Sequence, residues 1–126
     1  MDYLLDTNFI INYFKGIFQG DARQFTDSII NKTTFISVIT RIELLGVKSN
    51  DEDTLLINDF ISESIVFPLT ENIIQQTISL RKTKKVKLPD AIIAAIALVN
   101  NLQLLTHNIK DFKNISGLKV INANTL

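Results

Sequence analysis

Apolar residues alternate along the chain between short runs and longer segments in which they recur every three or four positions. Short runs are typical of buried strands, and the longer spacing is typical of helices with one buried face. Strands are predicted at residues 3–5, 33–37, 65–67, 102–106 and 118–121. Helices are predicted at residues 9–16, 20–31, 38–46, 51–62, 70–80 and 91–98, with a helical turn at 108–112. The apolar positions of the third and fourth helices include Ile42, Leu45, Leu55 and Leu56.

The alternation of strands with helices indicates a parallel sheet, because a helix must carry the chain back before the next parallel strand can begin. Such sheets are covered by helices on both faces. The sequence therefore predicts an α/β fold, a three-layer α/β/α sandwich with a central, mostly parallel sheet. Residues 91–98 are apolar almost all round, so this helix is expected to pack at the centre. The 126 residues are expected to form a single domain.

Composition narrows the class of protein further. Hydrophobic residues make up 46% of the chain and charged residues 21%, as in a compact globule. The absence of cysteine excludes disulfides, thiolate metal sites and cysteine nucleophiles. The sequence shows neither a signal peptide nor an apolar run of the ~20 residues that span a bilayer, so we expect a cytoplasmic protein. Thirteen basic and thirteen acidic residues balance, so any attraction to nucleic acid must be local.

Four acidic residues, Asp6, Glu43, Asp90 and Asp111, each lie in or against an apolar stretch. Carboxylates are rare in such places unless they have a partner. Each has an ordinary explanation when taken alone. Asp6 and Asp90 stand where helix-capping residues stand, Glu43 could be an exposed helix position, and Asp111 could be solvated in a turn. Asp6, however, ends the first strand, and ligands bind at the carboxyl ends of parallel strands.

Together the four acids favour a divalent metal site. Carboxylates that converge at one sheet edge repel one another unless a cation lies among them. Mg²⁺ or Mn²⁺ suits an all-oxygen site in a chain without cysteine. The one histidine, His107, is expected to be a surface or strand-end residue and not a ligand. Metal-bound carboxylate clusters commonly serve phosphoryl chemistry, so the expected reaction is hydrolysis of a phosphate ester.

A basic run precedes Asp90 and could bind a nucleic-acid backbone beside the acids. Its members are Arg81, Lys82, Lys84, Lys85 and Lys87. The run could equally be a solvated helix end whose cations lie at the negative end of the helix dipole.

Four segments, in this order, resemble the PIN-domain ribonucleases, and in particular the VapC-type toxins of prokaryotic toxin–antitoxin pairs. They are YLLDTNFIINYF, SVITRIELLG, KLPDAIIAAIAL and LLTHNIKDFKNI, and they span nearly the whole chain. The resemblance implies a PIN-like α/β/α fold and an endoribonuclease that depends on Mg²⁺ or Mn²⁺. It also implies a cognate antitoxin that neutralises the enzyme, and a homodimer.

The same resemblance assigns roles to individual residues. Asp6 matches the acid at the strand end, Glu43 the acid on the helix, and Asp90 the acid that opens the apolar helix, all three as metal ligands. Many relatives have a further acid at the place of Asn108, so Asp111 or Asn108 holds the fourth position. Supporting polar positions are Thr7, Asn8, Thr106 and Asn108.

Other classes remain as alternatives or are excluded. Phosphatases of the haloacid-dehalogenase type need a second Asp two residues after the first, where this chain has Asn8. No GK[ST] segment of a P-loop is present. A housekeeping RNA-processing nuclease and a catalytically silent RNA- or protein-binding module remain open. The presence of Asp6, Glu43 and Asp90 argues against the silent module, which would gain nothing from placing carboxylates against its core.

Overall fold

In the computed structural model, which describes residues 2–125 and the side chains of residues 2–124, the chain forms a sheet of five parallel strands. These are β1 (Tyr3–Leu5), β2 (Phe35–Ser37), β3 (Ile65–Phe67), β4 (Gln103–Leu105) and β5 (Val120–Ile121). Their order in the sheet is β3-β2-β1-β4-β5, and all four pairings are parallel. The chain runs outward from β1 to one edge and then returns to the other side of β1. The order therefore reverses between β1 and β4, where open α/β sheets bind their ligands.

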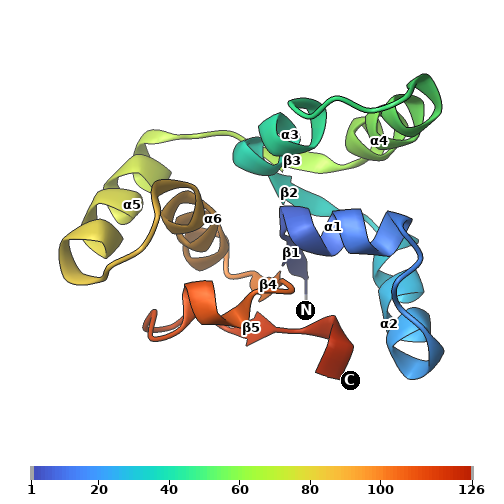
Figure 1. Ribbon diagram of the computed structural model, residues 1–126. Helices are drawn as coiled ribbons and strands as arrows, with labels where there is room; N and C mark the ends of the chain where they lie inside the picture. Colours follow the sequence, from blue (N-terminus) through green and yellow to red (C-terminus); the bar gives the residue numbers. More distant parts are fainter. Residues whose placement is uncertain (1, 126) are drawn as a thin grey trace.

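Helices cover both faces of the sheet (Figure 1). They are α1 (Thr7–Phe14), α2 (Gly20–Ile30), α3 (Val38–Leu45), α4 (Asp51–Glu63), α5 (Glu71–Thr83) and α6 (Leu88–Val99). Two short 3-10 helices follow β4 and β5, namely η1 (Ile109–Phe112) and η2 (Ala123–Thr125). In Figure 1, α5 and α6 lie on one side of the strands, and α1, α2 and α4 lie on the other. The predicted three-layer α/β/α sandwich is confirmed.

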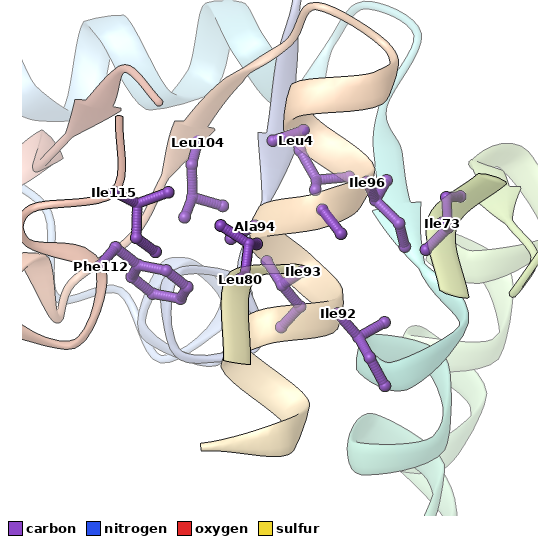
Figure 2. Packing of buried hydrophobic residues seen from close by; sticks show 12 residues of the cluster. Leu4, Ile73, Leu80, Ile92, Ile93, Ala94, Ile96, Leu104, Phe112 and Ile115 are labelled. Carbon is purple, nitrogen blue, oxygen red and sulfur yellow. The ribbon is translucent and has the colours of Figure 1, made fainter. Parts of the chain in front are cut away.

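Alternating residues of the central strands supply two separate cores, because successive side chains of a strand point to opposite faces. Leu4 and Leu104 pack beneath α6, and Figure 2 shows them with Ile93, Ile96 and Phe112. Their neighbours Leu5 and Leu105 point to the other face and pack against a cluster that includes residues of α1. The side chains of all four leucines are at most 1% exposed. The central place predicted for residues 91–98 is confirmed, since Ala91 to Ala97 are all buried.

Several helix boundaries differ from the sequence prediction by one to three residues, and α1 begins at Thr7 and ends at Phe14 where the sequence predicts residues 9–16. Helix α6 begins at Leu88, with Pro89 in its first turn, where a residue without an N–H loses no hydrogen bond. Helix α5 continues beyond Leu80 to Thr83, and its last turn contains the cations Arg81 and Lys82. Cations are favourable at this negatively polarised end of a helix. The helix η2 was not predicted.

The apolar periodicity of α3 and α4 does not mark buried faces throughout. Ile42 and Leu45 on α3 and Leu55 and Leu56 on α4 are exposed, by 41% to 63%. Helix α4 lies outside the sheet layer and buries Ile61, while α3 buries Thr40 and Leu44. These two helices therefore present apolar side chains to the surface. Within residues 2–125, no helix combines the length and apolar character that crossing a bilayer requires.

Candidate active site

Asp6 lies at the point where the strand order reverses. Its main-chain N–H donates to the Leu105 carbonyl at 3.0 Å, which continues the pairing of β1 with β4. One carboxylate oxygen, Oδ1, accepts the Thr7 N–H at 2.9 Å and caps α1. The other, Oδ2, accepts the Thr106 hydroxyl at 2.7 Å. Asp6 is only 6% exposed. The capping role considered for Asp6 is real, and it also fixes the orientation of a buried carboxylate.

Thr7 connects Glu43 to Asp6, since its main-chain N–H donates to Asp6 and its hydroxyl donates to Glu43. Thr7 Oγ1 donates to Glu43 Oε1 at 2.6 Å, and the hydroxyls of Thr7 and Thr40 lie 3.0 Å apart. Because Thr7 has one hydroxyl proton and gives it to Glu43, Thr40 must donate to Thr7. Ser37 in turn donates to Thr40 Oγ1 at 3.2 Å. The three hydroxyl residues are buried, so the chain of hydrogen bonds holds the Glu43 carboxylate from within the protein.

Sequence reasoning missed Ser37 and Thr40 as members of this arrangement. Their positions contained a signal, because Ser37, Thr40 and Glu43 are spaced by three residues. Side chains at this spacing lie along one side of a helix. Glu43 on α3 and Asp111 on η1 are exposed, so these two acids do not lie in the core although each stands against an apolar stretch of sequence. Only Asp6 is fully buried, and Asp90 is partly so.

Asp90 lies in the first turn of α6 but does not cap it. The N-cap residue is Lys87, and no side chain makes a capping hydrogen bond there, so the capping explanation for Asp90 is wrong. Burial raises the pKa of Asp90 to about 6, and the nearby charges of Asp111, Asp6 and Glu43 act in the same direction. Lys87 opposes the rise. Asp90 is therefore close enough to the other three acids and to one lysine of the basic run for their charges to change its pKa.

The pKa of Asp6 is also raised, first by burial and further by the charges of Glu43 and Asp111. The hydrogen bonds from Thr106 and Thr7 favour the ionised form and reduce the rise. The structure thus brings all four acids together near the carboxyl ends of β1 and β4. The residues come from four separate segments, which no local structure could gather.

The donor set suits a hard divalent cation. It consists of carboxylate oxygens, with hydroxyl groups behind them, and such oxygens are what Mg²⁺ and Mn²⁺ prefer. The only ion pair found among the described residues joins Arg23 to Asp27 on α2, away from the cluster. In residues 2–124, no three acidic or histidine side chains are close enough to enclose an ion as they stand.

The supporting residues occupy different positions around the cluster. Thr106 is buried, and its Oγ1 accepts the Asn108 main-chain N–H at 3.1 Å while its proton goes to Asp6. Asn8 is exposed on α1, and Asn108 is half-buried. The five cations of the basic run are all exposed and lie in the last turn of α5 and the segment that leads to α6. His107 is exposed directly after β4, as expected.

The raised pKa of Asp90 predicts how the metal-free protein responds to pH. Between the ordinary value of 3.8 and about 6, the folded protein binds more protons at this site than the unfolded chain does. This contribution therefore lowers the free energy of unfolding as the pH rises through that window. In EDTA, Asp90→Asn should melt close to the wild type at pH 4 and at a higher temperature at pH 7. A constant difference in melting temperature at the two pH values would contradict this.

The chain is similar to a known protein family and to several solved structures. A family model described as the PIN domain matches residues 3–118. No curated protein matches the sequence significantly.

Solved structures match over almost the whole chain. A toxin–antitoxin complex from Klebsiella pneumoniae contains a chain with 29% identity and a TM-score of 0.79, covering 97% of this chain and 98% of that chain. VapBC-1 from nontypeable Haemophilus influenzae matches with 27% identity and a TM-score of 0.77, covering 98% and 99%. VapBC2 from Rickettsia felis, bound to a DNA fragment from its promoter, matches with 26% identity and a TM-score of 0.78, covering 97% and 98%.

Proposed function

Since the chain belongs to the PIN-domain family, we propose that it is a metal-dependent endoribonuclease and the toxin of a toxin–antitoxin pair. The observation that carries the proposal is the convergence of Asp6, Glu43, Asp90 and Asp111 where the strand order reverses. The likeness to chains of toxin–antitoxin complexes supports the biological role. A housekeeping nuclease would share the site but would lack the partner.

Asp6, Glu43 and Asp90 would hold Mg²⁺ or Mn²⁺, with Asp111 completing the site. When bound, such an ion lowers the pKa of a water molecule and neutralises charge on a phosphodiester. The protein's own contribution is to orient the ligands. Thr106 and the Thr7 N–H fix both oxygens of Asp6, and the Thr7 hydroxyl fixes Glu43. Neighbours of this kind typically change metal affinity or activity by about 10- to 100-fold.

The basic run would bind the RNA backbone beside this site. Lys87 is close enough to Asp90 to lower the pKa of that carboxyl group, so the end of the run reaches the cluster. Lys84 and Lys85 precede it in the exposed segment between α5 and α6, and Arg81 and Lys82 lie one turn earlier. Exposed cations of this kind contact phosphates without reading the sequence.

Metal dependence is the direct test of the proposed reaction. The purified protein should cleave total RNA with Mn²⁺ or Mg²⁺, stop in EDTA, and recover when the metal is restored. Gel electrophoresis of the RNA measures this. A protein that binds RNA but leaves it intact under all these conditions would instead be the silent binding module. Expression without a partner should arrest growth if the protein is a toxin, whereas a housekeeping nuclease should be tolerated.

An apolar groove offers a place for the antitoxin. It lies between α1, α3 and α4, is lined by none of the four candidate metal ligands, and has a volume of about 400 Å³. Its lining consists of Ile11, Phe14, Lys15, Leu44, Val47, Lys48, Ser49, Asp53, Leu56 and Ile57. Leu56 and Val47 are 46% and 62% exposed. Amphipathic helices dock in such grooves with their apolar face inward, so we assign the groove to a helix of the antitoxin.

Two adjacent leucines of α4 provide a matched test of this groove. Leu56 lines it, whereas Leu55 is also exposed but does not. Leu56→Glu should weaken binding of the antitoxin at least about tenfold, since it places a charge in an apolar contact, and Leu55→Glu should not. Titration calorimetry with the purified protein encoded by the neighbouring reading frame measures this. Equal affinities of the two variants would place the antitoxin elsewhere.

A homodimer in the cytoplasm completes the proposal. Light scattering should then give twice the 14.2 kDa mass of one chain. A mass of one chain at micromolar concentration would contradict the dimer and leave the nuclease proposal intact.

A further inference from the structure

A polar cavity has Asp111 in its wall. It is formed by the segment that follows β4 and by the residue that follows β5, and its volume is about 480 Å³. The lining residues are His107, Asn108, Ile109, Lys110, Asp111 and Asn122. Asp111 is electrostatically close to Asp6 and Asp90, so the cavity opens directly beside the candidate active site.

The ring of His107 is held in place at the wall of this cavity. Asn124 Nδ2 lies 2.7 Å from His107 Nδ1, across 17 residues of sequence. Because the amide nitrogen donates, His107 Nδ1 accepts, and the proton of the neutral ring lies on Nε2. Asn124 is fixed in turn, since its main-chain N–H donates to Asn122 Oδ1 at 2.9 Å. The imidazole is therefore an exposed aromatic surface with a defined orientation.

Hydrogen bonds connect Asn108, a lining residue of the cavity, to the candidate metal ligand Asp6 through Thr106. The Asn108 N–H donates to Thr106 Oγ1, and Thr106 donates to Asp6. Lys110 supplies a positive charge, and the amides of Asn108 and Asn122 supply polar groups that can both donate and accept. An aromatic ring, amides and one cation are the groups by which proteins bind an unstacked RNA base and its phosphate.

We infer that this cavity is a base-binding subsite for the nucleotide next to the scissile phosphate. His107 would stack on the base, the asparagine amides would contact its edge, and Lys110 would contact a phosphate. The inference rests on the proposed ribonuclease function and adds to it a position that selects the base. His107 is a specificity residue in this assignment, and it does not take part in the chemistry.

Binding of mononucleotides tests the subsite without requiring cleavage. His107 is the only histidine in the chain, so its ring Hε1 signal in a proton NMR spectrum reports this one position. Adenosine or uridine 5′-monophosphate should shift the signal saturably, in metal-free buffer, whereas ribose 5-phosphate should not. An equal shift with ribose 5-phosphate, or no shift with any of the three, would overturn the assignment.

Variants then separate stacking from charge. Asn124→Ala removes the hydrogen bond that orients the ring and should reduce the shift. His107→Ala should weaken binding of a fluorescent single-stranded RNA hexamer about fivefold or more, the range of one base stack, but not binding of an abasic hexamer. Lys110→Ala should weaken both, and Lys113→Ala, an exposed lysine outside the cavity, neither. Equal losses on both hexamers with His107→Ala would overturn stacking. If the protein cleaves RNA but binds no base, the subsite is rejected and the nuclease function is retained. If it binds a base but does not cleave RNA, the nuclease function is rejected and the subsite is retained.

Discussion

Asp6→Asn is expected to reduce metal-dependent RNA cleavage by at least about 100-fold, because the loss of a ligand should cost as much as the loss of its outer-shell partners. The asparagine side chain has the same shape and can still cap α1 through its oxygen. It cannot supply two anionic oxygens, and its NH₂ group would face the Thr106 hydroxyl that now donates to Oδ2. Asp90→Asn should have a comparable effect. The initial rate of cleavage of a labelled RNA in Mn²⁺ measures both.

A matched substitution controls for the change of charge. Asp59→Asn removes one carboxylate from the exposed surface of α4 and should leave cleavage unchanged. Thermal unfolding in EDTA should show that Asp6→Asn remains folded, since it relieves repulsion among the four acids. Cleavage by Asp6→Asn at the wild-type rate would remove this residue from the site and, with Asp90→Asn equally active, would reject the proposed site altogether.

Phe112→Ala is expected to have the largest effect on stability, a loss of about 3–5 kcal/mol in the free energy of unfolding. Phe112 is 2% exposed and packs with Ile93 and Ile115 in the core beneath α6 (Figure 2). Truncation leaves a cavity there and removes the anchor of η1. Urea unfolding measures the loss. Ile109→Ala, in the same short helix but 37% exposed, should change stability by no more than about 0.5 kcal/mol. Similar losses in the two variants would contradict this packing argument.

The anchor also affects the site. Asp111 directly precedes Phe112 in η1, so the buried ring determines where that carboxylate lies. At a temperature where Phe112→Ala is still folded, its cleavage rate should therefore fall more than that of Ile109→Ala.

The sequence predicts the elements well because their signals are local. Apolar runs and helical spacing identify every strand and α-helix found in residues 2–125, and Thr70, the first residue of the predicted helix 70–80, is the N-cap of α5. Helix α6 begins three residues before the predicted apolar segment 91–98, because Leu88, Pro89 and Asp90 belong to its first turn, where a proline loses no hydrogen bond. The order of the strands depends on which strands pair, and no local pattern contains that information.

The same limit applies to the candidate site. Strand-end and helix-start positions identify Asp6 and Asp90 as candidates, and the family resemblance ranks them. The link from Glu43 through Thr7 to Thr40 becomes visible only when α1 and α3 lie side by side. Ile42 and Leu56 are exposed although they lie on predicted apolar faces, because periodicity shows that a helix has an apolar face but not whether the fold covers it.

The hydrogen bond between Thr106 and Asp6 joins residues 100 positions apart. During synthesis the amino-terminal part of a chain emerges and can fold first, and it contains Asp6, Glu43 and Asp90. The pocket around Asp6 nevertheless stays open until β4 has been made and has paired with β1. The proposed nuclease activity should therefore arise only at the end of folding, and a nascent or truncated chain that lacks residues 103–111 should not show it.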